Sequence, residues 1–437
     1  MSLPITNLLE KDQTERRLKV LIVAVAVHPD KGSEPGLGWG WIHALSKHHD
    51  LWVITGEREG NREAIARRFA ENPDLRELLH IYFIPRPDGP YIEEIVPLLY
   101  YRTYRKWHEQ AFALARDLHK KIGFDLAHQL NMTGFREPGY LWKLNLPFVW
   151  GPVGGTANVP LRFGSILGPR EFLYHIAKVI TNNLQLRFHR RVRLALSRAD
   201  GFVTSTSDTR RAFLRSRGKD SVVIADSSPP VTATKSQKVR AEQEKDKLLL
   251  SWSGLHVSRK ALPLVLHALS LLQDDHDCHL DIVGEGPMTQ NWKSLARKLR
   301  VESRCSWHGW VKIDTAYQIV SNSDVLIFSS LHEGMPTTVM QALSVGVPVI
   351  CLDHCGQGDA VTRESGMKIP VTTPKEVIEK LAYSIAYFCE HPGELQNLSV
   401  GAILRSKEFE WNKKVEKMLN VYQEALERWT SRKEYKR

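Results

Sequence analysis

Residues 331–342 of this chain, LHEGMPTTVMQA, place a carboxylate between an apolar run and a helical pattern. The apolar run predicts a strand, and Pro336 is a residue favoured in the first turn of a helix. Ligands of open parallel sheets bind beyond the carboxyl ends of the strands, so the loop that carries Glu333 is a candidate binding site. The N–H groups of Gly334 and Met335 would there face negative charge or sugar hydroxyls. The alternative is that Glu333 only favours the dipole of the following helix.

Three other segments of the second half combine glycine with charged or apolar residues: 253–260 (SGLHVSRK), 280–287 (LDIVGEGP) and 345–349 (VGVPV). Together with residues 331–342 they resemble, in order and spacing, the family 4 retaining glycosyltransferases, which have the GT-B fold. The resemblance covers roughly residues 250–370. It implies two Rossmann-like domains around a central cleft and a nucleoside-diphosphate sugar as donor, with no further cofactor and no metal.

The resemblance also implies roles for single residues. Lys260 matches the phosphate-binding lysine of the family, Glu333 its contact to the donor sugar, and His128 its histidine near that sugar, so these three are predicted to be catalytic. A departing nucleoside diphosphate develops negative charge, which fixed cations stabilise more in the transition state than in the ground state. The predicted donor-binding residues are Gly36, Gly38, Gly254, Arg259, Gly284, Gly334, Met335, Pro336, Thr337 and Gln341.

Two positions depart from the family pattern. Leu255 stands where the family has an arginine, and Arg259 would supply that charge, unless it is an exposed cation at a helix start. Gln341 stands where the family has a second glutamate that holds the ribose. A charged hydrogen-bond acceptor contributes about 1.5–3 kcal/mol and a neutral one about 0.5–1.5 kcal/mol, so a weaker nucleotide affinity is expected. Both departures also support a non-catalytic protein that binds nucleotide-sugar or acts as a scaffold.

The first half contributes two glycine-containing loops at predicted strand ends, residues 28–39 and 150–155. The first resembles the family loop that reaches toward donor phosphates and acceptor, and its glycines would permit a close backbone approach. The alternative is a tight turn that binds no ligand. The residues predicted to lie on the acceptor side are Glu34, Trp39, Gly154 and Gly155. His128 has the alternative of a purely structural histidine.

The elements that position these residues alternate along the chain. Apolar runs between amphipathic stretches predict a parallel sheet in each half, because parallel strands are buried on both faces. The predicted strands are residues 19–27, 49–55, 79–83, 126–129, 148–151 and 201–205 in the first half, and 248–252, 280–283, 325–329 and 347–351 in the second.

An α/β protein of two doubly wound domains follows from this order. The predicted parts are a flexible N-terminus (1–17), an acceptor-side domain (18–230), a polar linker (231–247), a nucleotide-sugar-binding domain (248–412) and a C-terminal helix (413–437). We expect that last helix to pack back on the N-terminal domain.

The net charge of +11 is concentrated in residues 1–230, which hold 33 Lys and Arg against 24 Asp and Glu. Residues 187–217 alone contain nine Arg. Aromatic or apolar residues alternate with cations in residues 100–107 and 184–196, a mixture suited to a membrane interface. We therefore expect an anionic membrane surface as a partner; the alternatives are helices packed on their own domain and solvated charge.

The five cysteines, an odd number, suit a reducing compartment, and no apolar run approaches the length of a membrane span. The sequence thus predicts a cytoplasmic enzyme, peripheral to the membrane, that glycosylates a glycan or lipid-linked acceptor in cell-surface polysaccharide or glycolipid synthesis. A nucleic-acid-modifying glycosyltransferase is the remaining alternative. Because no nucleic-acid-binding module is recognisable, nucleic acid is not expected as a partner.

Overall fold

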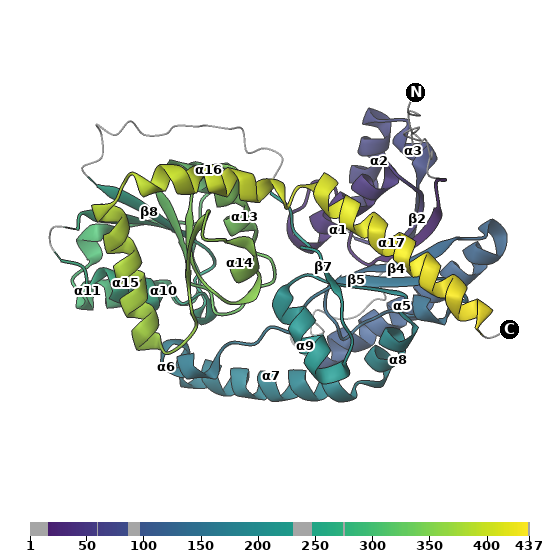
Figure 1. The fold of residues 1–437 in the computed structure, drawn as a ribbon, viewed down its shortest axis with the longest axis horizontal. Helices are drawn as coiled ribbons and strands as arrows, with labels where there is room; N and C mark the ends of the chain where they lie inside the picture. Colours follow the sequence, from purple (N-terminus) through teal and green to yellow (C-terminus); the bar gives the residue numbers. More distant parts are fainter. Residues whose placement is uncertain (1–15, 59, 86–96, 230–246, 274–275, 436–437) are drawn as a thin grey trace, which may run out of the picture.

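The computed structural model describes residues 16–58, 60–85, 97–229, 247–273 and 276–435. The predicted flexible N-terminus and the predicted linker lie outside the described residues, apart from residues 16–17 and 247. Within the described part the chain forms two α/β domains, each built on a wholly parallel sheet (Figure 1).

The N-terminal sheet has seven strands in the order β3-β2-β1-β4-β5-β6-β7. Its strands are β1 (Lys19–Ala24), β2 (Asp50–Glu57), β3 (Leu79–Pro85), β4 (Leu126–Asn131), β5 (Phe148–Val153), β6 (Gly201–Thr204) and β7 (Val222–Val223). In β1, β4 and β5 nearly every residue is buried, because helices cover both faces of the sheet.

The C-terminal sheet has six strands in the order β10-β9-β8-β11-β12-β13. Its strands are β8 (Leu248–Ser253), β9 (Cys278–Val283), β10 (Cys305–Gly309), β11 (Val325–Phe328), β12 (Val349–Leu352) and β13 (Gly366–Ile369). β8 and β11 are neighbours, with Leu250 opposite Val325, so the loops at their carboxyl ends emerge side by side.

The helices follow the strand-helix alternation. Those of the first half are α1 (Ser33–Ser46), α2 (Asn61–Glu71), α3 (Leu75–Leu78), α5 (Pro97–Ile122), α6 (Gly164–Leu167), α7 (Pro169–Phe188), α8 (Arg190–Arg198) and α9 (Ser207–Arg217). Those of the second half are α10 (Leu262–Leu269), α11 (Thr289–Lys298), α12 (Ile313–Asn322), α13 (Thr337–Ser344), α14 (Cys355–Ala360), α15 (Pro374–Glu390), α16 (Glu394–Lys407) and α17 (Trp411–Glu434).

Helix α17 returns to the N-terminal domain and completes its core (Figure 1). Met418 and Tyr422 are buried in the same cluster as Ile22 of β1 and Ile42 of α1. At the start of α17, the ring of Trp411 meets Trp41 edge-on at 5.4 Å between centroids. The N-terminal domain is therefore built from both ends of the chain.

A second crossing occurs within the first half. Phe163 and Leu167 are buried in the hydrophobic core of the C-terminal domain, together with Leu262 and Leu331. Residues 159–167 thus reach into that domain, and α7 carries the chain back along one long edge of the molecule (Figure 1). The predicted domain of residues 18–230 is not self-contained.

The two segments expected to contact a membrane behave differently. In residues 100–107, Tyr104 and Trp107 are buried in the N-terminal core, so the expectation of a membrane-facing segment is wrong for these side chains. In residues 184–196, Val192 and Leu196 are buried, whereas Leu184 and Phe188 of α7 are exposed. None of the helices in the described parts of the chain is long and apolar enough to span a bilayer.

Candidate functional site

Two loops at the carboxyl ends of β8 and β11 form the centre of the candidate site. The first loop ends in a short 3-10 helix, Ser258–Lys260, and the second carries residues 329–336 into α13. The backbone N–H of Leu331 donates to the carbonyl of Arg259 at 2.8 Å, and the hydroxyl of Ser329 donates to the carbonyl of Lys260 at 2.9 Å. These bonds fix the relative position of the two loops.

The side chains of the same loops converge on one carboxylate oxygen. Oε1 of Glu333 accepts from Nζ of Lys260 at 2.7 Å, from Nη1 of Arg259 at 2.9 Å and from the hydroxyl of Ser330 at 2.8 Å. Burial alone would raise the pKa of Glu333, but the charges of Lys260 and Arg259 outweigh it and hold the pKa below its ordinary value. The carboxyl is therefore ionised at neutral pH, with two cations fixed beside it.

Glycines shape the surface next to this cluster. Gly284 has φ of +117°, and a Cβ there would lie 2.1 Å from the carbonyl oxygen of Gly254, so only glycine fits without displacing that loop. Gly254 in turn lies against the side chain of Lys260. A Cβ at Gly334 would meet no atom within 4 Å, so the backbone beside Glu333 is open to an approaching group.

The residues predicted at the start of α13 do not all share this surface. Thr337 is exposed at the helix start, directly after Pro336. Met335 is buried, and its carbonyl accepts from the hydroxyl of Ser227 at 3.0 Å, which ties this loop to the N-terminal domain. Gln341 is buried on the second turn of α13.

His128 does not lie at this site. It is fully buried in β4, with Nδ1 2.6 Å from the hydroxyl of Tyr422 and Nε2 2.7 Å from the carbonyl oxygen of Gly151. Burial lowers its pKa to about 4, so the ring is neutral and both nitrogens are already engaged. The prediction that His128 orients a sugar is therefore wrong for this structure, because Tyr422 of α17 and the carbonyl of Gly151 occupy both ring nitrogens inside the N-terminal core.

Gly36 and Gly38 both lie in close contact with backbone of the N-terminal domain, and Gly38 also lines a small cavity beside Glu34. The expected loop becomes helix α1 at Ser33, and both glycines lie within it. A Cβ at Gly36 would lie 2.1 Å from the carbonyl oxygen of Lys31, and one at Gly38 would lie 2.2 Å from that of Ala26. Close backbone contact inside the N-terminal domain accounts for both.

Three of the four predicted acceptor-side residues come together at the carboxyl ends of the N-terminal strands. Oε1 of Glu34 accepts from the N–H of Thr133 at 2.8 Å, and the carbonyl of Thr133 accepts from the N–H of Gly154 at 2.7 Å. Gly155 follows with φ of +79° and is exposed. Burial raises the pKa of Glu34. Trp39 points elsewhere, stacked on His43 at 5.9 Å and packed on the domain core.

Sequence reasoning missed the residues of the N-terminal domain that face the carboxylate cluster. Lys178 of α7 has its pKa lowered by burial and by the charges of Arg136 and Arg259. Burial, together with Lys178 and Arg259, lowers the pKa of His332 to about 4. The Ser258 hydroxyl also donates to Glu171 of α7 at 2.5 Å. Helix α7 is thus a wall of the site, and its sequence carries no motif that would have indicated this.

A second contact between the domains joins the start of α9 to α14. Oδ2 of Asp208 accepts from the N–H of Cys355 at 2.7 Å and lies 3.5 Å from Nδ1 of His354. The ligand atoms of these three residues lie within 4.8 Å of one another, a spacing that a metal ion would allow. However, Asp208 also pairs with Arg211, and burial raises the pKa of Cys355 to about 12. These partners favour an interdomain hydrogen-bond contact.

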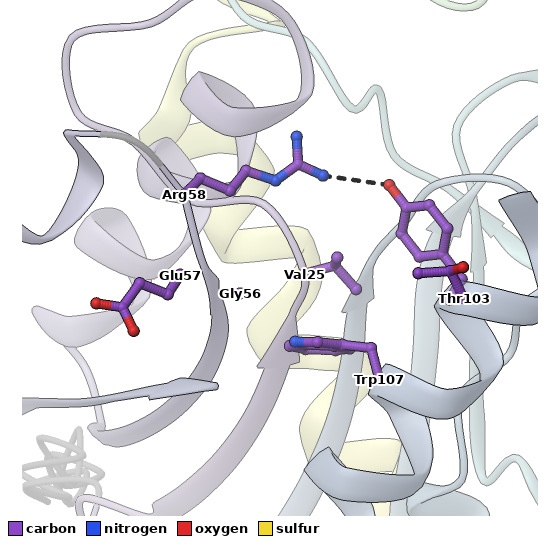
Figure 2. Close-up of a pocket in the computed structure, with 7 residues that line it drawn as sticks. Val25, Gly56, Glu57, Arg58, Thr103 and Trp107 are labelled. Atoms are coloured by element: carbon purple, nitrogen blue, oxygen red, sulfur yellow. Dashed lines mark hydrogen bonds between the residues drawn. The ribbon is translucent and has the colours of Figure 1, made fainter. Parts of the chain in front are cut away.

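A small pocket of about 20 Å³ opens at the carboxyl ends of β1 and β2 (Figure 2). Arg58 and Tyr104 both line it, and an Nη of Arg58 donates to the Tyr104 hydroxyl at 3.2 Å. Trp107 forms its apolar floor. This pairing of a cation with aromatic rings lies on the N-terminal domain, in line with the expected acceptor side.

Comparison with known proteins places these features in context. Residues 233–399 match the family model described as glycosyl transferases group 1. A lipopolysaccharide 1,6-galactosyltransferase of Salmonella typhimurium is 31% identical over 97 residues, which are 22% of this chain and 27% of the relative. The putative colanic acid biosynthesis glycosyltransferase WcaL of Escherichia coli is 22% identical over 241 residues, 53% of this chain and 59% of the relative. This chain therefore aligns with only part of each relative.

Two solved structures share the architecture over nearly the whole chain. The apo form of the lipopolysaccharide outer core galactosyltransferase WaaB has a TM-score of 0.63 at 15% identity, covering 93% of this chain and 99% of the other. Anabaena HepE in complex with UDP has a TM-score of 0.55 at 15% identity, covering 93% and 100%. The fold implied by the resemblance is confirmed: the chain has the GT-B fold, and its residues 233–399 match the model of the group 1 glycosyltransferases.

Proposed function

We propose that this protein is a retaining glycosyltransferase that moves a sugar from a nucleoside-diphosphate sugar to a glycan or lipid-linked acceptor. The observation that carries the proposal is the convergence of Lys260 and Arg259 on Glu333, at the carboxyl ends of two adjacent parallel strands. Two fixed cations at such a position suit the phosphates of a leaving nucleoside diphosphate.

In the proposed reaction, Lys260 and Arg259 take the negative charge that develops on the diphosphate as its bond to the sugar carbon breaks. The acceptor hydroxyl attacks from the same face and passes its proton to an oxygen of the departing diphosphate, which retains the configuration at that carbon. Glu333 orients the sugar, and the open backbone at Gly334 leaves room for it. The protein's own cations supply the charge stabilisation in this scheme, so we propose that no metal is needed.

The acceptor side is proposed to be the N-terminal domain. Glu34, Gly154 and Gly155 border it at the ends of the strands, and Arg58 with Tyr104 forms the nearby pocket of Figure 2. Relatives named for lipopolysaccharide and colanic acid synthesis support an acceptor of cell-surface polysaccharide or glycolipid synthesis. We propose a cytoplasmic location at the membrane surface, where such acceptors are made.

The test compares nucleotide binding and turnover in matched variants. HepE was solved with UDP, which makes uridine nucleotides the first to try in a thermal-shift panel of nucleotide-sugars. A bound donor raises the unfolding temperature with the logarithm of its saturation. Lys260→Ala is expected to remove most of the shift and to lower donor hydrolysis or transfer about 100-fold or more. The control, Lys312→Ala, changes an exposed lysine of the same domain.

Near-normal turnover of Lys260→Ala would refute the proposed role of this lysine. A wild-type protein that binds nucleotide-sugars but neither hydrolyses nor transfers them, in a mixed acceptor screen, would instead favour the non-catalytic alternative. That alternative is supported by buried Gln341 and exposed Leu255, the two positions at which this chain departs from the family pattern.

A further inference from the structure

Helix α7 presents an apolar face to solvent. Its exposed large hydrophobic side chains are Leu173, Tyr174, Ile180, Leu184 and Phe188, each at least 53% exposed. At 100° per residue these five positions fall within a stripe about 120° wide along the helix. Because a helix on a protein surface normally turns its apolar stripe toward the core, this orientation requires an explanation.

The opposite face of α7 is partly polar, although it is the buried one. Asn182 is buried, where its amide donates to Asn158 at 2.7 Å and its carbonyl accepts from Arg136. His175, two helical turns before Asn182 on the same side of the helix, is also buried and lies near Glu171. The helix is therefore inverted relative to an ordinary surface helix, with hydrogen bonds inward and apolar side chains outward.

Positive charge surrounds the apolar stripe. Residues 161–217, which include α7 and its neighbours, hold twelve Lys and Arg against three Asp and Glu. The three acidic groups are already engaged: Glu171 with Ser258, Asp200 with Arg432 and Asp208 with Arg211. Arg170, Arg187 and Arg190 are exposed at the two ends of the helix. A partner with a negative surface above an apolar interior fits this arrangement.

We propose that the outer face of α7 docks on an anionic lipid bilayer, with its apolar stripe at the headgroup boundary and its flanking arginines on the lipid phosphates. A bilayer surface is preferred to a protein partner because a nearly straight stripe of five apolar residues, with exposed arginines at both ends of the helix, matches a planar anionic interface. The inference rests on the proposed function in one respect: a lipid-linked acceptor would lie in that membrane.

The same helix connects the docking face with the site. Lys178 lies on the side of α7 toward Arg259 and His332: the charge of Arg259 helps to lower the pKa of Lys178, and Lys178 helps to lower the pKa of His332. Docking through the outer face would hold the loops of the site above the bilayer at a distance set by the thickness of one helix, about 10–12 Å.

The experiment is co-sedimentation with vesicles of phosphatidylglycerol and phosphatidylcholine in equal parts, compared with vesicles of phosphatidylcholine alone, at low salt. The wild-type chain is expected to bind the anionic vesicles and to lose binding as salt screens the charges. The variant Leu184→Asp/Phe188→Asp is expected to bind at least about tenfold more weakly, because each change removes an inserted apolar side chain and adds a repelled charge.

A matched control carries the same two changes on another exposed helix. Val400 and Leu404 of α16 have the same spacing and similar exposure, so Val400→Asp/Leu404→Asp is expected to bind as the wild type does. Circular dichroism checks that both variants are folded. The proposal is overturned if the wild type ignores anionic vesicles, if both double variants lose binding equally, or if the α7 variant instead converts a dimer to a monomer in the absence of lipid.

Binding is measured without donor or acceptor, so its failure leaves the proposed function standing. Conversely, a chain that binds vesicles through α7 but gives no thermal shift with any nucleotide-sugar would retain the docking surface and lose the proposed reaction. The α7 variant is also expected to keep the wild-type thermal shift with nucleotide-sugar, because the changed side chains point away from Lys260 and Glu333.

Discussion

Replacing Tyr422 by Phe tests whether His128 serves the core of the N-terminal domain instead of the reaction. The two side chains are buried, with the Tyr422 hydroxyl 2.6 Å from Nδ1 of His128. The carbonyl of Gly151 can only accept, so Nε2 of the neutral ring carries the proton and Nδ1 accepts from Tyr422. Tyr422→Phe removes that donor and leaves a buried ring nitrogen unpaired.

An unsatisfied buried polar atom costs about 1–3 kcal/mol. A domain of 150–250 residues loses about 2–4 °C in unfolding temperature per kcal/mol, so a loss near 2 kcal/mol lowers the unfolding temperature of the N-terminal domain by about 4–8 °C. The change deletes one oxygen atom and creates no sizeable cavity. The assay is thermal unfolding followed by near-ultraviolet circular dichroism, with nucleotide-sugar affinity measured in parallel and expected to change less than about twofold.

Tyr383→Phe is the matched control, since Tyr383 is exposed on α15 and its loss should leave the unfolding temperature unchanged. The reasoning fails if Tyr422→Phe unfolds like the wild type. It fails more seriously if the variant stays equally stable and loses nucleotide-sugar binding or turnover, because His128 would then act in the site.

Three further predictions follow from buried charge, backbone strain and titration. Lys414→Ala is expected to destabilise the fold by about 3–5 kcal/mol in thermal denaturation, because the buried Lys414 side chain lies over the Trp411 ring at 3.6 Å, donates to the carbonyl of Ser227 at 3.1 Å and lies beside the half-buried Asp226; an equal melting temperature would contradict this. Gly284→Ala is expected to cost about 1–3 kcal/mol and to weaken nucleotide-sugar binding, since its Cβ would push on Gly254, whereas Gly393→Ala, in open space, should change neither. The pKa of His128 falls from 6.5 to about 4 on folding, so between those pH values the unfolded chain binds more protons and the folded state loses stability on acidification. About 2 kcal/mol of the free energy of unfolding should be lost between pH 7 and pH 5. Urea unfolding of His128→Asn over the same pH range should lack that part of the loss.

The sequence allowed the C-terminal half of the site to be predicted because its determinants are local. Lys260 and Glu333 each follow an apolar strand within a few residues, and parallel neighbours bring such loops together. Three strands, β7, β10 and β13, were not predicted because they lack the continuous apolar run from which the other strands were predicted. β7 has two residues, β10 reads CSWHG, and β13 contains a lysine between its apolar residues.

The determinants of the N-terminal half lie far apart in the sequence. The partner of His128 is 294 residues away, so nothing near His128 indicates that it is enclosed. Gly38 was predicted to bind a ligand because glycine permits a close approach. The sequence alone does not say whether the group that approaches is a phosphate or, as in the structure, the carbonyl of Ala26. Likewise, the apolar residues of 159–167 predict burial but not which domain buries them.

The two crossings of the chain determine how the domains can move. α7 lies along one long edge of the molecule and the junction of α16 with α17 along the other (Figure 1). A motion that opens the α7 edge must withdraw Phe163 and Leu167 from the C-terminal core, at about 1.5–3 kcal/mol for each side chain exposed. A motion at the other edge must separate Ser227 from Met335, Ser207 from Asp359 and Asp208 from Cys355, three hydrogen bonds of about 0.5–3 kcal/mol each. It must also withdraw Ala225 from the core of the C-terminal domain. The costs at the two edges are comparable, so the chain resists domain opening on both sides, and the orientation of the acceptor-side residues around Glu34 relative to Glu333 is held at two places.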